Sequence, residues 1–466
     1  MSAASAAMRQ SRISRGAALA RLALRIGGRY VARSPKLLFA SVEHRAELRH
    51  DLAYRSADEV AEELGSMKGV LMKLGQMASY IYDDMPLTFR AAMSRLQHRA
   101  APMTPELAAS VIRQELAGEP EQLFREWDPL PFAAASIGQV HRAITRDGRA
   151  VAVKVQYPGI ARSITSDLRN VGLLRRVVGA AFPGLDTRSF VDEVSDRLRE
   201  EVDYVREAES QEVFARYYDG HPVIRVPHVV PELSTARVLT SELVSGSSFD
   251  DLLTWDQHEK DLAAETIHRF VFRSLYRLHA FNGDPHPGNY LFHGDGRVTF
   301  LDFGLTKMFT DADLKPLIDA VRCLVFEKDY EAFRAALEQA GFLKPGAPVP
   351  TQLVVDRFGQ FYGTVLQDAP MTITPAYASA IVRRFFDARG PLAPYSDVPR
   401  EYVIMQRINL GLYALLGSLN ATANWRRIAE EIWPFRNGPP STPIGEAEAR
   451  WEATRASTTL EKVIKN

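Results

Sequence analysis

Two acidic residues and one amide in the second half of the chain have the types and spacing needed to hold a divalent cation against phosphate groups. Asp284 lies five residues before Asn289, and a strand-like run then ends in Asp302-Phe303-Gly304. A carboxylate such as Asp284 can orient or deprotonate a nucleophile, while an amide oxygen and a second carboxylate are hard ligands that suit Mg²⁺. The pattern predicts phosphoryl transfer, with Asp284 catalytic and with Asn289 and Asp302 as metal ligands.

A lysine and an acidic segment further upstream supply the other parts that this chemistry needs. The spacing of Asp284 and Asn289 is similar to that of the protein-kinase catalytic loop, and kinases use a strand lysine to contact the α- and β-phosphates. Lys154 ends an apolar run, and the acidic segment offers Glu201 and Glu207 as its partner. These glutamates are separated by about 600° of helical rotation, so they do not share a face. The residues alone leave the choice between them open.

The segment before Lys154 differs from the glycine-rich loop that protein kinases place over the phosphates. It is rich in alanine and contains one glycine, Gly138. Alanine restricts positive φ and stiffens a turn, so we expect the nucleotide to be held differently here. Glu242 falls where a connector between two lobes is expected, whose backbone would bind adenine, although an ordinary exit from a strand explains it equally well. The candidate nucleotide-binding residues are Ala133, Ala134, Ala135, Ser136, Lys154 and Glu242.

The surrounding elements follow the order of a helical region, a small β-rich region, a connector and a second helical region. Thr104 and Pro105 have the types expected at the start of a helix, and Gly294-Asp295-Gly296 predicts a hairpin. We expect helices over 56–96, 102–123 and 189–209, strands over 131–143, 150–156, 223–230 and 238–243, and mostly helices after 246. This order predicts an α+β fold, a protein-kinase-like two-lobed core with an N-terminal helical extension.

The same order predicts the division of the chain into domains. The expected boundaries are 1–55 for a basic leader, 56–125 for the helical extension, 126–245 for the N-lobe, 246–436 for the C-lobe and 437–466 for a tail. The proline-rich stretch at 437–443 predicts the end of the packed region. For the last twenty or so residues we expect either a mobile tail or a peripheral helix.

Composition and charge are ordinary for a globular protein except near the N-terminus. The chain has 466 residues, 46% of them apolar and 24% charged, and a formal net charge of zero. Residues 1–42 contain no acid, and Arg21, Arg25, Arg29 and Arg33 recur every fourth position. This stripe predicts an amphipathic helix on an anionic membrane surface. A solvated basic leader and a mitochondrial transit peptide are the alternatives.

Cysteine content and hydropathy exclude several other classes of protein. Cys323 is the only cysteine, so no disulfide can form within the chain and a reducing compartment is favoured. No apolar run is long enough to predict a membrane-spanning helix, and no secretory signal peptide is evident. We therefore expect a cytoplasmic protein that is peripheral at a bacterial inner membrane, or alternatively a protein of the mitochondrial matrix.

Three further motifs, together with the catalytic loop, resemble the UbiB/AarF family of atypical kinase-like proteins, which is linked to isoprenoid quinone synthesis. The motifs are Lys73-x-Gly75-Gln76, the alanine-rich segment 133–139 and Glu201-x-Asp203. The resemblance runs from about Arg21 to Trp433. Gln97-His98 departs from it, because the family often has Gln-Asp there, and the hydrophobic C-terminal segments of many bacterial relatives are missing.

The resemblance implies a nucleotide site that the N-terminal extension covers. In the family the extension folds over the cleft, which suppresses protein kinase activity in trans and leaves ATP binding and a lipid-stimulated ATPase. By this analogy Lys73 and Gln76 would point toward Glu201 and Asp203, and Glu207 would pair with Lys154. Ala135 would lie over the phosphates, and ATP and Mg²⁺ would be the cofactors. The regulatory residues implied are Lys73, Gly75, Gln76, Glu201 and Asp203.

The leading hypothesis is an atypical kinase or ATPase that binds Mg-ATP and supports the biosynthesis of ubiquinone or a related lipid. The expected partners are anionic membrane lipid and quinone-biosynthesis proteins or lipid precursors, with no nucleic acid; a homodimer is compatible with the sequence. One alternative is a small-molecule phosphotransferase like the aminoglycoside and choline kinases. Another is a nucleotide-binding scaffold without turnover.

Overall fold

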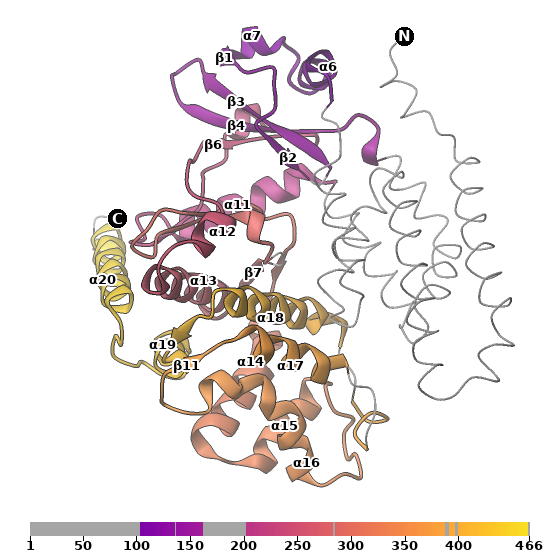
Figure 1. The fold of residues 1–466 in the computed structure, drawn as a ribbon, viewed down its shortest axis with the longest axis vertical. Helices are drawn as coiled ribbons and strands as arrows, with labels where there is room; N and C mark the ends of the chain where they lie inside the picture. Colours follow the sequence, from indigo (N-terminus) through magenta and orange to yellow (C-terminus); the bar gives the residue numbers. More distant parts are fainter. Residues whose placement is uncertain are drawn as a thin grey trace, which may run out of the picture. The chain divides into compact units, whose positions relative to one another are not determined.

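The computed structural model describes residues 103–135, 137–161, 202–282, 285–386, 391–396 and 399–464 (Figure 1). The described residues divide into two compact units: unit 1 holds those up to Val205 together with Val230–Thr240, and unit 2 holds Arg206–Val229 together with those from Ser241 onward. The predictions for Lys73, Gly75, Gln76, Ser136, Glu201, Asp284 and the basic leader lie outside the described residues.

Unit 1 contains a sheet in the order β1-β3-β4-β6, with β2 paired to β3. The alternating Val151, Val153 and Val155 of β4 are fully buried, as period-2 patterning requires. They share one apolar cluster with Val111 and Ile112 of the helix α6. The bounds are α6 Pro105–Leu116, β1 Phe124–Trp127, β2 Ala133–Ala135, β3 Gly138–Thr145, β4 Ala150–Gln156, the 3₁₀ helix η1 Pro231–Leu233 and β6 Val238–Glu242.

Two predicted elements of unit 1 are each divided in the structure. The single helix predicted over 102–123 ends at Leu116, because Ala117 takes a left-handed φ of 56°, and the short α7 (Pro120–Leu123) follows. Thr104 caps α6 as predicted, accepting a hydrogen bond from Leu107 N. The strand predicted over 131–143 is a tight hairpin of β2 and β3 in which Ala135 pairs with Gly138.

Unit 2 is mostly helical, as predicted, and its core lies around α13 (Gln257–Arg277). Phe270 of α13 stacks on Phe300 of β9, so the helix supports the hairpin that carries the predicted metal ligands. The 223–230 strand prediction shrinks to β5 (Ile224–Arg225), which pairs in parallel with β9. The first elements of this unit are α11 (Tyr204–Tyr217, which begins two residues before it), β5, α12 Phe249–Leu253, α13, β7 Ala280–Asn282, η2 Pro287–Asn289, β8 Tyr290–Phe292, β9 Val298–Phe300 and β10 Thr306–Met308.

The remaining helices of unit 2 gather at one end of it in Figure 1, apart from α20, which lies along its side. No described helix is long and apolar enough to cross a membrane. The bounds are α14 Asp311–Val321, η3 Arg322–Glu327, α15 Tyr330–Gln339, α16 Thr351–Phe358, η4 Gly359–Val365, β11 Met371–Thr372, α17 Pro375–Phe386, α18 Arg400–Ser418, β12 Thr422–Ala423, α19 Trp425–Ile432 and α20 Pro443–Ile464.

The C-terminal segment is a helix, the second of the two alternatives predicted for it, and buried charges attach it to α13. Arg269 is fully buried and bonds Glu265 at 2.7 Å, Glu431 at 2.8 Å and Glu448 of α20 at 2.8 Å. His221 Nε2 donates to Glu448 at 3.0 Å, because its Nδ1 accepts from the Ile224 backbone N–H. Burial alone would raise the pKa of Glu448, but the bond from His221 and the nearby arginines outweigh it and hold the pKa at about 2.

Candidate functional site

The predicted metal ligands of unit 2 lie at one end of the β8–β9 hairpin. Leu301 N donates to the backbone oxygen of Asn289 at 3.0 Å, so Asn289 stands opposite the residue that precedes Asp302. His286 shapes the loop, because its Nδ1 accepts from Gly288 N at 3.0 Å. The backbone pairing and the His286 hydrogen bond thus fix the backbone positions from which the Asn289 and Asp302 side chains extend.

Asp302 is held on both its backbone and its side chain. The Asn282 amide donates to the Asp302 carbonyl at 2.7 Å, and Gly304 N donates to Asp302 Oδ1 at 3.0 Å. Asn282 stands where protein kinases have the histidine of the His-Arg-Asp triplet, and β7 pairs with β10 through Asn282 and Thr306. The Asn282 side chain therefore supports the Asp302 backbone in this chain.

A second carboxylate, that of Glu207, lies on the same side of Gly304 as Asp302. A Cβ placed on Gly304 would stand 3.4 Å from Asp302 Oδ1 and 3.6 Å from Glu207 Oε2. Glu207 is only 3% exposed. Two carboxylates this near one point favour a positive neighbour, because like charges in a buried place repel each other. The arrangement suits a divalent cation or an ammonium group.

Pro285, the residue after Asp284, packs against α18. A Cβ on Gly411 of α18 would stand 2.3 Å from Pro285 Cγ, far inside any real contact. Only glycine at 411 lets the helix approach the proline ring this closely. Gly411 thus sets the position of Pro285, the residue next to the predicted catalytic aspartate.

In unit 1, Lys154 lies on β4 opposite Val140 of β3. Its Nζ is 4.8 Å from the centre of the Tyr204 ring, within the range of a cation–π contact. Asp203, a predicted regulatory residue, accepts a hydrogen bond from Val205 N at 3.2 Å, at the start of α11. The ring and the cap both lie at the first turn of the helix that carries Glu207.

The alanine-rich segment forms a regular hairpin rather than an open loop. Ala133 and Ala134 are exposed and Ala135 is half-buried on β2. A Cβ on Gly138 would stand 2.3 Å from the Val155 carbonyl, so the single glycine is required by the close approach of β4. This hairpin therefore carries small side chains on a backbone that is held by antiparallel pairing of β2 with β3.

Gln139, which closes the alanine-rich motif, is buried and structural. Its Oε1 accepts from Met103 N at 2.9 Å and its Nε2 donates to His141 Nε2 at 2.8 Å. The His141 Nδ1–H donates to the Asp128 carbonyl at 3.0 Å, and burial lowers the His141 pKa. A neutral ring is consistent with this pattern, so the motif's glutamine anchors the hairpin from behind.

Glu242 ends β6 and is engaged with its own unit. Its backbone N–H donates to the His228 carbonyl at 3.0 Å, and its carboxylate lies 3.5 Å from Arg225. The Glu242 side chain thus pairs with Arg225 at the end of β6. This geometry fits the ordinary structural explanation of Glu242 and leaves adenine binding by the connector backbone a prediction.

Chemically, the donor set fits Mg²⁺ with nucleotide phosphates. Asp302 and Asn289 offer hard oxygen ligands, and Glu207 adds a nearby carboxylate. The sequence missed Gly411, Tyr204 and the approach of both Glu207 and Asp302 to Gly304. The first two carry no local motif, and the third brings a residue about a hundred positions upstream to Gly304.

Comparisons with known proteins point the same way. A model of the ABC1 atypical kinase-like domain matches residues 95–337. The chain is 32% identical over 423 residues to the uncharacterized protein sll0005 of Synechocystis, covering 88% of this chain and 60% of that protein. It is 34% identical over 305 residues to the mitochondrial atypical kinase COQ8B of Rattus norvegicus, covering 64% and 57% of the two chains. The chain thus spans about half to three fifths of these relatives.

A solved structure also shares the fold. The complex of Rv3197 with erythromycin from Mycobacterium tuberculosis matches with a TM-score of 0.62 and 29% sequence identity, covering 85% of this chain and 100% of that chain. The domain match and this likeness confirm the predicted α+β, protein-kinase-like fold.

Proposed function

The chain belongs to the ABC1 family of atypical kinase-like proteins, the UbiB/AarF family that its motifs resemble, and on that premise we propose that it binds Mg-ATP and hydrolyses it or transfers its γ-phosphoryl group. The observation that carries the proposal is that the carboxylates of Asp302 and Glu207 both lie close to Gly304, 3.4 Å and 3.6 Å from the position that a Cβ would take there. Two carboxylates near one point favour a cation at that place.

Each residue has a distinct task in the proposed reaction. When bound, Mg²⁺ supplies charge neutralisation on the phosphate oxygens. Asp302 and Asn289 would hold it, and Asp284 would orient or deprotonate the attacking hydroxyl or water. Lys154 would contact the α- and β-phosphates, and Ala135 would lie over the phosphates.

We propose that Glu207, and not Glu201, is the helix partner of Lys154. Tyr204 lies under the lysine ammonium, and Glu207 is three residues further along α11, on the same helix face. Glu201 and Asp203 are then left to meet Lys73 and Gln76 of the extension. In that arrangement the extension suppresses transfer to protein substrates.

The test is the hydrolysis of ATP by the purified full chain with Mg²⁺, in the parent and in Asp302→Asn. Losing a metal-ligand carboxylate is expected to lower turnover by about 100-fold or more and to weaken Mg-nucleotide binding. Asp295→Asn, an exposed hairpin acid, is the matched control and should keep full activity. Equal turnover in the parent and Asp302→Asn would remove the proposed site.

We also propose a lipid setting for this activity. Two relatives are named mitochondrial atypical kinases, and a third is named a chloroplastic activity of bc1 complex kinase. We propose quinone or related lipid biosynthesis at the surface of a membrane, with anionic lipid and quinone-biosynthesis proteins or lipid precursors as partners. ATP hydrolysis should rise with anionic liposomes and a quinone-precursor analogue. Deleting residues 1–42 should reduce liposome flotation while the fold is kept; unchanged flotation contradicts membrane contact by the leader.

A small-molecule acceptor is the second candidate, because the similar solved structure is a complex with erythromycin. Phosphorus NMR of a reaction containing ATP and erythromycin separates the two. A phosphoester signal supports a small-molecule phosphotransferase, whereas inorganic phosphate alone supports the ATPase.

A further inference from the structure

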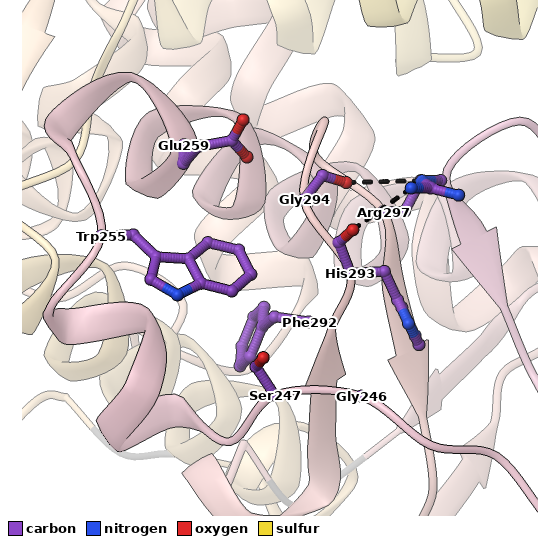
Figure 2. A pocket seen from close by; sticks show the side chains of 8 residues that line it. All are labelled: Gly246, Ser247, Trp255, Glu259, Phe292, His293, Gly294 and Arg297. Carbon is purple, nitrogen blue, oxygen red and sulfur yellow. Dashed lines mark hydrogen bonds between the residues drawn. The ribbon is translucent and has the colours of Figure 1, made fainter.

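Unit 2 has a surface pocket of about 650 Å³ that shares no lining residue with the predicted phosphoryl-transfer site. Three segments build it: the connector after β6, the start of α13 and the β8–β9 hairpin (Figure 2). Its lining residues are Gly246, Ser247, Trp255, Glu259, Phe292, His293, Gly294 and Arg297.

Close backbone contacts fix the wall of the pocket beside the hairpin. Ser247 and Phe292 exchange two backbone hydrogen bonds of 2.9 Å. A Cβ on Gly246 would stand 2.8 Å from His293 Cε1, so the connector can pass here only as glycine. Gly294 has a φ of +78° and no side chain, which leaves the hairpin side of the pocket open. The pocket therefore belongs to the fold.

The basic groups in the wall already have partners. The Arg297 guanidinium donates to the carbonyls of His293 at 3.2 Å and Gly294 at 3.4 Å (Figure 2). His293 Nε2 lies 2.8 Å from Thr299 Oγ1, and burial lowers the pKa of the ring. These contacts direct the Arg297 donors and the His293 ring toward acceptors of the protein itself, although the Arg297 guanidinium keeps its charge.

Glu259 is the exception among the polar groups of the pocket. It lies in the first turn of α13, where the helix dipole supports a negative charge. Its Oε2 is buried and accepts no hydrogen bond from any residue that the structure describes. A buried acceptor without a donor is destabilising, so a ligand that supplies a donor is favoured there. The position that a Cβ would take on Gly294 is 3.9 Å from this oxygen, so the carboxylate faces the open side of the hairpin.

The aromatic rings of Trp255 and Phe292 lie below Glu259 in Figure 2 and complete the chemistry of the pocket. Aromatic faces attract cations, and a carboxylate above them adds charge and a hydrogen-bond acceptor. We propose that this pocket binds a small organic ammonium ion: an N–H₃⁺ group that donates to Glu259, carried on an apolar body that packs against Trp255 and Phe292.

The experiment compares two probes of nearly equal shape, 2-phenylethylammonium and the neutral 2-phenylethanol, titrated into the full chain at pH 7 by calorimetry or NMR. The expected result is binding of the amine about tenfold or more tighter than the alcohol, corresponding to one charge-assisted hydrogen bond. Glu259→Gln, which keeps the side-chain shape, should remove the preference for the amine. Trp255→Leu should weaken both probes.

Glu331→Gln is the matched control, since Glu331 is an exposed acid in the first turn of α15 and its loss changes the net charge equally. It should leave both affinities unchanged. Three results would overturn the proposal. The first is equal affinity of the parent for the two probes, and the second is no binding of either probe at about 10 mM in neutral buffer. The third is a preference for the amine that survives Glu259→Gln. Circular dichroism of each variant shows whether it is folded. Binding is read without ATP, so this result and that of the ATPase assay are separate.

Discussion

The two units fix their predicted functional residues by different means. In unit 1 Lys154 lies on a regular strand whose alternating valines pack against α6, so its position follows from ordinary β-sheet geometry. In unit 2 Asp302 and the loop before Asn289 depend on contacts that glycine alone permits and on side chains far apart in the sequence. Small side-chain substitutions near the predicted functional residues of unit 2 should therefore have larger effects on ATP hydrolysis than similar substitutions in unit 1.

The substitution expected to have the largest effect on activity, and so the strongest test of this comparison, is at Gly411. Gly411→Ala would place a methyl group 2.3 Å from Pro285 Cγ, so the loop next to Asp284 must move. Misplacement of reacting groups by about 1 Å costs about 100-fold in rate. We expect kcat for ATP hydrolysis to fall by about that factor with KM for ATP changed by less than about threefold, because the loop acts on the chemistry and not on nucleotide binding.

A second substitution distinguishes positioning from a general loss of stability. Pro285→Ala removes Cγ, so the double variant Gly411→Ala with Pro285→Ala should recover most of the lost kcat. Gly359→Ala is the matched control, because a Cβ there meets nothing closer than 3.7 Å. If the double variant is no more active than Gly411→Ala, this contact does not position the loop.

Acid should separate the two units by their stability, because buried charges stabilise unit 2 and apolar packing dominates unit 1. The folded pKa of Glu448 is about 2, below its ordinary 4.5, so its contribution is present above pH 4.5 and is lost as the pH falls toward 2. By pH 3 the loss from this group is about 2 kcal/mol. His221, whose pKa burial lowers, acts in the same direction below pH 6.5.

Urea unfolding followed by tryptophan fluorescence at pH 7 and pH 3 measures this effect. Trp451 and Trp425 report on unit 2 and Trp127 on unit 1. Glu448→Gln should lower stability at pH 7 and flatten the pH dependence by about the same 2 kcal/mol. An unchanged pH dependence in Glu448→Gln would mean that the α20 charge network does not stabilise the fold.

The smallest expected effect is in unit 1. Ala135→Gly should loosen the hairpin that would cover the phosphates and change the affinity for ATP and ADP by about twofold to fivefold, since glycine adds backbone freedom worth about 0.5–1 kcal/mol. Fluorescent-nucleotide titration measures it. Identical ATP and ADP affinities in the mutant and the parent would mean that the alanine does not tune the site.

The sequence predicted the elements with strong local signals. The Thr104–Pro105 helix start, the valine alternation in β4 and the glycine-rich turn of the β8–β9 hairpin each depend on neighbours in the chain, and the structure has all three. It did not predict where long elements divide, because the left-handed Ala117 and the tight pairing of Ala135 with Gly138 have no strong composition signal.

The candidate site was predictable as a set of residue types but not as a geometry. The chemistry of Asp302 and Asn289 follows from their spacing. The support from Asn282, the approach of Glu207 to Gly304 and the contact of Gly411 with Pro285 are non-local, and they follow only from how the helices of unit 2 pack. The roles predicted for Lys154, Glu207, Asn289 and Asp302 remain predictions, as do those of Asp284, Glu201 and the Lys73–Gln76 motif.

The single cysteine of the chain has a practical consequence for spectroscopy. Cys323 is buried, and burial raises the pKa of its thiol, so it should react slowly with maleimide reagents. Leu253 is 41% exposed and lies two residues before Trp255. A cysteine introduced by Leu253→Cys would be labelled selectively without first removing the native thiol. An environment-sensitive fluorophore there would report occupancy of the neighbouring pocket in the otherwise unmodified protein.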